Sequence, residues 1–348
     1  LEIADANQRT PLLVAAEVDR KTIARLLIAA NAALDAYDGK EMTALAHAAR
    51  NGSLSLVHAL LAAKAPVDGP CYGAITPLVC AAEKNDKNIV EALLAAKACI
   101  DGEGIPSALT AATVHYHCDV VRQLLAANAA VEGEPDAEIT PLCAAAGKRS
   151  IVAAELLLDA KADVNGLDAD GQAPLMHATR AESSAMAQVL LEAGADPDGC
   201  VDVDDQDREH ATPLELAAHR GYLDLVCQLL WSKASMEIRA GKHNIPLMLA
   251  AATGHEDILW ALMRHGAVAD SVDDAGCTPL MHAAAAGHSA SITQLLEGAL
   301  YSAIAVDDPS LSWRKCVFRM KDCLVTFRST GRLPARFGRK KKRINSRR

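Results

Sequence analysis

The sequence predicts an all-α repeat solenoid, in which short antiparallel helix pairs stack along one axis. The first observation is a Thr-Pro-Leu tripeptide that returns at intervals close to 33 residues over most of the chain. The second is composition: 51% of the residues are hydrophobic, but only 3% are aromatic. A core made of Ala, Leu and Val rather than large rings favours thin helices packed closely together.

The repeat is found by comparing the sequence with itself. Thr-Pro-Leu begins five units, and degenerate forms such as Thr43-Ala-Leu and Ser107-Ala-Leu begin four more. A fixed period of this length is the mark of a repeat architecture. The nine units begin at residues 10, 43, 76, 107, 140, 173, 212, 245 and 278, in steps of 33, 33, 31, 33, 33, 39, 33 and 33 residues.

The first element of each unit is a short helix. Threonine is a good N-cap, because its hydroxyl accepts a hydrogen bond from an unpaired amide of the first turn. Proline suits the next position, where no amide donor is needed. Leucine and a pair of alanines follow, as in Leu12 with Ala15-Ala16. Small side chains at these positions let a second helix approach closely.

The second element is a turn followed by another helix. The turn contains glycine in several units, such as Gly52 and Gly221. Apolar pairs at helical spacing then mark the second helix, as in Val120-Val121 with Leu124-Leu125. A polar stretch rich in Asp and Gly, such as residues 163–171, closes the unit and predicts a β-turn or hairpin.

Two antiparallel helices and a hairpin finger in each 33-residue unit resemble the ankyrin repeat, over roughly residues 1–300. The resemblance implies a protein-binding solenoid, because one repeat cannot bury its own apolar face. Residues 1–9 look like the hairpin that precedes a repeat, so we expect a fragment of a longer array.

The units also depart from the family pattern. The histidine that the family places after Thr-Pro-Leu is absent from all nine, so we expect its bonds to the cap to be lost. The glycine that usually ends the second helix remains only as Gly194 and Gly266. In the other units the position carries asparagine or lysine, and a left-handed backbone there costs a lysine on the order of 1 kcal/mol. These residues are Lys64, Lys97, Asn128, Lys161 and Lys233. We expect the pattern to end near residue 297.

Charge divides the chain into two regions. Residues 1–309, the expected repeat array, carry a net charge of −22, whereas residues 310–348 carry +13. We expect this basic tail to be disordered. Its five consecutive bases, Arg339, Lys340, Lys341, Lys342 and Arg343, are typical of a nuclear-import signal, a nucleic-acid contact or an anionic-membrane contact. A tail that folds back on the acidic array is a further hypothesis.

The sequence predicts no catalytic residues, cofactor or metal. The ten cysteines include no Cys-x-x-Cys pair, and their scatter favours free thiols in a reducing, cytoplasmic compartment. His117 and its neighbour Cys118 could form a metal cluster, but the repeat register places His117 in the turn between two helices, a structural position. The acidic loop 202–209 lacks the glycine and the glutamate of a calcium-binding frame.

By analogy with the family, we expect partner contacts at the hairpin tips and the exposed ends of the first helices. The candidates are Arg9, Tyr37, Lys40, Arg50, Asn51, Tyr72, Glu83, Lys84, Lys148, Asp170, Arg180, Arg208, His219, Arg220 and Lys242. His47, His177 and His282 precede the alanine pair, on the side expected to face the concave surface. For these three histidines we expect packing within the chain, and contact with a partner is the alternative.

The function predicted from these observations is that of an adaptor or scaffold that binds another protein, and not that of an enzyme. A nuclear or nucleic-acid-associated regulator that uses the basic tail is the alternative. A second alternative is a regulatory array within a larger enzyme or channel chain. We expect a monomer, without a membrane span, in which nucleic acid could bind only through the tail.

Overall fold

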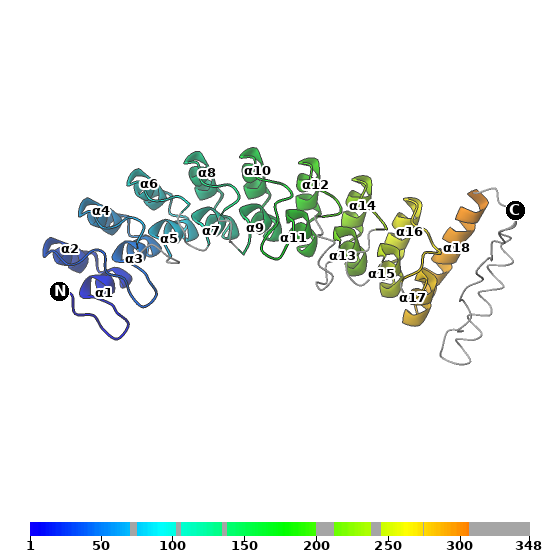
Figure 1. The fold of residues 1–348 in the computed structure, drawn as a ribbon, viewed down its shortest axis with the longest axis horizontal. Coiled ribbons are helices and arrows are strands. Elements are labelled where there is room, and N and C mark those ends of the chain that lie inside the picture. Colours follow the sequence, from blue (N-terminus) through cyan, green and yellow to red (C-terminus); the bar gives the residue numbers. More distant parts are fainter. Residues whose placement is uncertain are drawn as a thin grey trace, which may run out of the picture.

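The structure is a computed structural model that describes residues 1–69, 75–101, 106–133, 138–199, 212–237, 245–273 and 275–305, with side chains as far as residue 298. Over these residues the chain forms eighteen α-helices, arranged as antiparallel pairs in a curved stack (Figure 1). The predicted all-α repeat solenoid is confirmed. The one β-bridge outside the helices, in this described part, joins Tyr37 to Thr43 in the second finger.

The first helix of each pair lies on the concave side of the stack (Figure 1). These inner helices are α1 (Pro11–Glu17), α3 (Ala44–Arg50), α5 (Pro77–Glu83), α7 (Ala108–Val114), α9 (Pro141–Gly147), α11 (Pro174–Arg180), α13 (Pro213–Arg220), α15 (Pro246–Thr253) and α17 (Pro279–Ala286). Each begins directly after the residue at which the repeat period starts, so the nine predicted repeat starts coincide with the N-caps.

The predicted hydroxyl caps are present. Thr43 Oγ1, for example, accepts from the amide of Ala46 at 3.2 Å, and Ser107 Oγ accepts from Thr110 at 3.2 Å. Ala173 and Ile245 have no hydroxyl and make no side-chain cap. Loss of such a cap costs about 1 kcal/mol.

In the seventh unit another side chain takes the place of the missing histidine at the cap. Glu215, three residues after Thr212, accepts from the Thr212 amide at 2.8 Å, while Thr212 Oγ1 accepts from the Glu215 amide at 3.1 Å. This reciprocal capping box satisfies two amides that a helix start otherwise leaves unpaired.

The second helix of each pair lies on the convex side (Figure 1). These outer helices are α2 (Lys21–Ala29), α4 (Leu54–Ala62), α6 (Lys87–Ala95), α8 (Cys118–Ala126), α10 (Ile151–Asp159), α12 (Ser184–Glu192), α14 (Leu223–Trp231), α16 (Glu256–Arg264) and α18 (Ser289–Ala305). The repeat pattern was expected to end near residue 297, but α18 is a single helix of 17 residues that continues to Ala305. The glycine at 298 does not end it.

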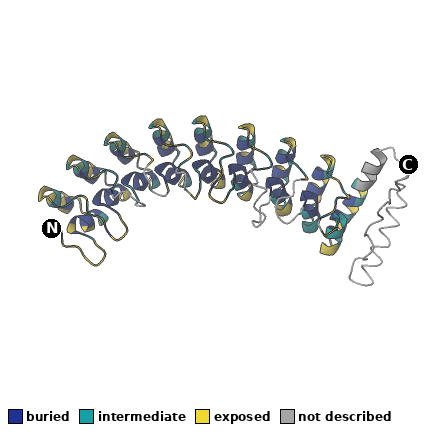
Figure 2. Cartoon of the chain, viewed as in Figure 1, coloured by how far each residue is buried: buried dark blue, intermediate teal, exposed yellow. Residues whose placement is uncertain are grey.

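The core is one continuous layer between the two rows of helices (Figure 2). Alanines such as Ala48, Ala49 and Ala82 are fully buried in the inner helices, and leucines such as Leu60 and Leu93 are fully buried in the outer helices. Alanine lets neighbouring inner helices approach more closely than the leucine-rich outer helices can. The stack therefore curves with the inner helices and the fingers on its concave side.

The backbone after the outer helices is left-handed, as the family pattern requires. The φ angles are 64° at Lys64 and Lys97, 72° at Lys161 and 66° at Lys233, while Gly194 and Gly266 stand at the same register position with φ of 95° and 97°. A side chain with a Cβ is strained in this conformation, whereas glycine is not.

Replacement of Lys64, Lys97, Lys161 or Lys233 by glycine is therefore expected to stabilise the array, each by up to about 1 kcal/mol. Urea unfolding followed by circular dichroism at 222 nm would measure the change. Gly194→Lys is the matched reverse variant and should destabilise by a similar amount. Equal stability of the wild type and all five variants would contradict the strain argument.

Candidate functional site

The fingers are held by an aspartate that bonds to its own turn and to the following helix. Asp38 Oδ1 accepts from the amides of Lys40 at 2.8 Å and Met42 at 3.0 Å, and its Oδ2 lies 2.9 Å from His47 Nε2. One carboxylate thus fixes both the shape of the finger and its position against α3.

The same arrangement occurs in two further units. Asp168 accepts from the amide of Gln172 at 2.8 Å and lies 2.7 Å from His177 Nε2. Asp273 accepts from the amide of Cys277 at 2.7 Å and lies 2.9 Å from His282 Nε2. Each histidine comes nine residues after its aspartate, so the pairing follows the repeat register.

These pairs agree with the packing role expected of the three histidines. Each one bonds within the chain, which is the packing role rather than the contact role. His47 is only 5% exposed, too little for direct contact with a partner. His177 and His282 are half-buried, so partner contact through their exposed edges stays a prediction.

Hydrogen bonding shifts the acidity of two finger aspartates. Burial acts to raise the pKa of Asp38, but the hydrogen bonds from the Met42 amide and the His47 ring outweigh it, and the pKa lies below its usual value. At Asp273 burial also opposes the shift, and bonds from Cys277 and His282 lower the pKa. Both carboxylates are therefore ionised at neutral pH.

A second set of polar groups joins consecutive repeats. Asp101 Oδ1 accepts from the amide of Ala130 in the next unit at 2.7 Å, and Asp198 Oδ1 accepts from Ser235 at 2.6 Å. The same register position supplies the acceptor in other units. These acceptors are Glu2, Asp68, Glu132 and Asn165. Part of the negative charge of the array thus has a structural purpose.

The histidines in the turns also join repeats, as their register predicted. His117 Nε2 lies 2.9 Å from the carbonyl oxygen of Glu83, in the preceding unit. His255 and His288 make the equivalent contacts at 3.2 Å with the carbonyls of His219 and Ala252. The structural role expected of His117 is confirmed.

The exposed ends of the inner helices form a row of cations along the stack, the turn-end row. Its members are Arg50, Lys84, Lys148, Arg180 and Arg220, from five different repeats. All five are exposed. An inner helix of seven residues places this row about 10 Å from the acidic fingers at its other end. The turn edge thus carries a row of exposed cations, although Glu83 and Glu182 also lie there, whereas carboxylates predominate in the fingers.

Other candidate positions differ in how free their side chains are. Lys40, Asp170 and His219 are exposed, and Tyr37 is exposed beside its β-bridge. Glu83 is half-buried. Four candidates donate hydrogen bonds within the chain. Arg50 donates to Met42 Sδ at 3.2 Å and Arg220 to the Arg180 carbonyl at 3.4 Å, in neither case to a carboxylate. Arg9 pairs with Asp5 at 2.7 Å and Glu17 at 2.9 Å, and Asn51 donates to the carbonyls of Ala16 and Glu17.

Several candidates lie outside the described residues. These are Tyr72, Arg208, Lys242, the acidic loop 202–209 and the basic run Arg339, Lys340, Lys341, Lys342 and Arg343.

The sequence analysis missed a pair of tryptophans on the convex side. Trp231 is 78% exposed at the end of α14, and Trp260 is 52% exposed on α16. Trp231 contacts the edge of the His265 ring, and the Arg264 guanidinium lies 4.6 Å from the centre of the Trp260 ring. Comparison by register could have found them, because Trp260 stands where other units carry polar residues such as Glu91 and Glu155.

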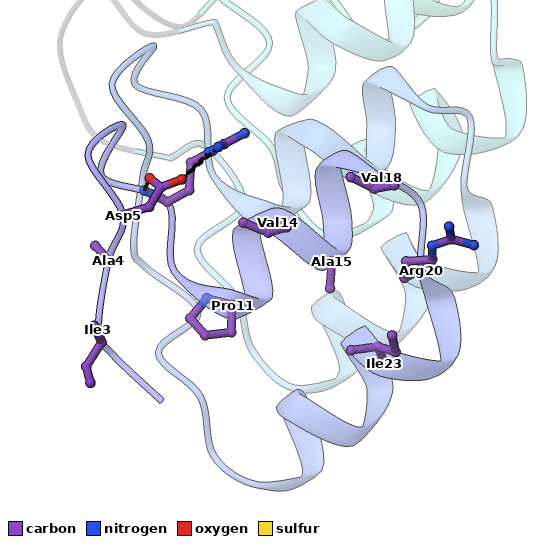
Figure 3. Close-up of a pocket in the computed structure, with 10 residues that line it drawn as sticks. Ile3, Ala4, Asp5, Pro11, Val14, Ala15, Val18, Arg20 and Ile23 are labelled. Carbon is purple, nitrogen blue, oxygen red and sulfur yellow. Dashed lines mark hydrogen bonds and ion pairs between the residues drawn. The ribbon is translucent and has the colours of Figure 1, made fainter.

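A shallow apolar hollow lies at the first repeat, lined by residues that include Pro11, Val14, Val18 and Ile23 (Figure 3). Val18 and Ile23 are each more than half exposed, and Pro11 is exposed although the equivalent Pro77 is buried. In the other units a preceding repeat packs against this side of the helix pair. The hollow is thus a repeat-stacking face rather than a shaped ligand site.

One group of side chains in the described residues brings three metal-ligating atom types together. Cys143, Asp168 and His177 offer atoms that all lie within 4.8 Å of one another. No metal site was predicted from the sequence, in which Cys143 lies 25 residues before Asp168. No helix in the described part of the chain is long and apolar enough to cross a membrane.

Comparison with known proteins agrees with the geometry. A family model described as "Ankyrin repeats (3 copies)" matches residues 1–70, 22–103, 109–199 and 214–304. The crystal structure of the human ASB11 ankyrin repeat domain is similar in fold, with a TM-score of 0.53 and 24% identity over 64% of this chain and 97% of that chain. No curated protein matches the sequence significantly.

The finger aspartate gives a stability prediction. Asp38→Asn removes the charged acceptor of His47 and two amides, and is expected to cost about 1–3 kcal/mol at pH 7. Because the pKa of Asp38 is lowered in the folded state, its stabilisation is present above the unfolded pKa of about 4 and is lost as the pH falls through the folded pKa.

Urea unfolding of wild type and Asp38→Asn at pH 7 and pH 3 would test this, and the difference between them should shrink at the lower pH. Asp35→Asn, at an exposed position on the same finger, is the matched control and should change stability little. A difference that stays constant between the two pH values would contradict the assigned role.

Proposed function

Because the chain belongs to the ankyrin repeat family, whose members are generally protein–protein interaction modules, we propose that it is an adaptor or scaffold. It binds a segment of another protein along the concave face and the finger tips. The repeat fold is typically non-enzymatic, and we assign the chain no catalytic role. The protein acts in the cytoplasm as a monomer.

The observation that carries this proposal is the separation of charge across the inner-helix layer. The turn-end row is basic and exposed, whereas the finger edge is acidic and many of its carboxylates are engaged within the array. A partner that presents acidic side chains is attracted to the turn-end row, because these cations form no ion pair among the described residues. The five cations come from repeats two, three, five, six and seven, so an extended segment can contact all of them.

Single contacts of this kind are weak. An exposed ion pair contributes about 0.2–1 kcal/mol, so five pairs give modest affinity unless apolar contacts add to them. Many small contacts on a rigid curved surface are typical of recognition by repeat proteins. The affinity is expected to depend strongly on ionic strength.

Reversal of two cations of the turn-end row tests the location. Lys148→Glu with Arg180→Glu in the full chain should weaken binding to a purified partner at least tenfold, because two attractions become repulsions. Isothermal titration at two salt concentrations measures the loss. The partner is first identified by affinity capture and mass spectrometry.

Two matched variants on the convex side serve as controls. Arg122→Glu reverses an exposed cation on α8, and Trp231→Ala with Trp260→Ala removes the exposed tryptophans. The proposal expects both to bind normally. If the tryptophan variant loses binding while Lys148→Glu with Arg180→Glu binds normally, the contact lies on the convex side.

The split in charge between the array and the tail supports a second candidate function, that of a nuclear or nucleic-acid-associated regulator. The +13 of residues 310–348 includes five consecutive bases, which suit contact with phosphates or an import receptor. In this candidate the array still binds a protein, and the tail supplies localisation or phosphate contacts.

Removal of residues 310–348 distinguishes the two functions. For the regulator, the full chain binds DNA or RNA with an affinity that falls steeply with salt, and the truncated chain does not. Fluorescence anisotropy with a labelled oligonucleotide measures both. If neither chain binds nucleic acid while both retain the protein partner, only the adaptor remains.

A further inference from the structure

We propose that Cys143, Asp168 and His177 form a binding site for a thiophilic divalent cation of the zinc type, between the fifth and sixth repeats. Cys143 lies in the first turn of α9, Asp168 in the following finger and His177 in α11. Their Sγ, carboxylate oxygen and ring nitrogen all lie within 4.8 Å of one another.

The chemistry of the three groups suits such an ion. Thiolate, imidazole and carboxylate are the three zinc ligands of proteins, with bonds of about 2.0–2.3 Å. Ligand atoms around a tetrahedral ion are then about 3.3–3.8 Å apart. Cys143 Sγ must therefore move closer to the other two atoms, and the 2.7 Å distance between Asp168 and His177 must lengthen. Thiolate and carboxylate together balance two positive charges, and the neutral imidazole adds none.

The other finger pairs act as internal comparisons. Asp38–His47 and Asp273–His282 have the same geometry, so the aspartate–histidine contact by itself is a structural feature of these fingers. Cys143 is the fourth residue of the repeat that precedes its pair. The equivalent residue is Leu13 in the repeat before Asp38–His47 and Met248 in the repeat before Asp273–His282. Cys277 lies beside Asp273, but among the three described pairs only Asp168–His177 has a thiol within 4.8 Å of both ligand atoms.

The surroundings orient the ligands. Asp168 Oδ1 is held by the amides of Asp170 at 3.0 Å and Gln172 at 2.8 Å, which leaves Oδ2 directed at His177. Cys143 Sγ lies 3.5 Å from the carbonyl oxygen of Gln172 in the same finger. His177 is partly exposed, so an ion can enter from its side, and water or a partner side chain supplies the fourth ligand.

Binding exchanges a proton for the ion. Burial raises the pKa of the Cys143 thiol to about 12, with Asp168 adding to the rise, so the free thiol is protonated at neutral pH. When the sulfur–metal bond forms, the thiol proton passes to solvent. The His177 proton that Nε2 donates to Asp168 moves through solvent to Nδ1, so that the Nε2 lone pair binds the ion. Affinity should therefore increase with pH.

Titration of the full chain with Co²⁺ in a phosphine reductant tests the site, because a cobalt–thiolate bond gives a charge-transfer absorption band in the near ultraviolet. Cys143→Ala should lose the band and still fold, since Ala46 occupies this position in the second repeat. Cys80→Ala, which removes an equally buried thiol from the inner helix α5, two repeats away, should keep it.

A gain of binding gives an independent measurement. Met248→Cys places a thiol beside Asp273 and His282, and should raise the number of bound Co²⁺ ions by one. Zn²⁺ should also raise the thermal midpoint of the wild type more than that of Cys143→Ala. The proposal is overturned if the wild type shows no thiolate band, or if Cys143→Ala binds Co²⁺ as the wild type does.

Discussion

The structure depends on how closely neighbouring inner helices can approach. Each helix pair has apolar residues on both sides that face other repeats, so an isolated pair would leave them in water. Alanines at the inner-helix contacts allow the close approach, and leucines fill the wider space between the outer helices. Burial of this layer is the main favourable contribution to folding, and the difference in side-chain size sets the curvature that produces a concave face.

Polar groups then fix the position and angle of each repeat on the next, which the apolar layer alone does not determine. Stacking alone would permit small sliding or rotation of one repeat on the next, because hydrophobic contact has no direction. Carboxylates such as Asp101 and Asp198 bond to an amide of the following repeat, and turn histidines such as His117 bond to a carbonyl of the preceding one. These bonds lie at opposite ends of the helices, so together they set the register and the angle between repeats.

The fold could be predicted from the sequence because the same local helix signals occur in nine repeats. Thr-Pro-Leu or a degenerate form of it marked each inner helix, and the turn position of His117 indicated its structural role. The aspartate–histidine pairs were not predicted, although their nine-residue spacing is visible, since neither residue alone distinguishes contact with a partner from contact within the chain. The extension of α18 was missed because a glycine at 298 is only a weak helix breaker when packing continues. Trp231 and Trp260 were missed because exposure depends on which side of the outer helix faces solvent.

The same regularity explains how a repeat array acquires a site without altering its fold. Cys143 stands at the fourth position of its unit and contacts the following finger, and Leu13 and Met248 hold the same position in α1 and α15. The Asp–His contact recurs for a structural reason, so two possible ligands are positioned before any function needs them. One substitution at the fourth position then changes the chemistry of the cluster, while the capping and stacking that hold the repeat in place remain unaffected. Surface cations such as Lys148 and Arg180 vary with equal freedom, because they lie beyond the layer on which stability depends.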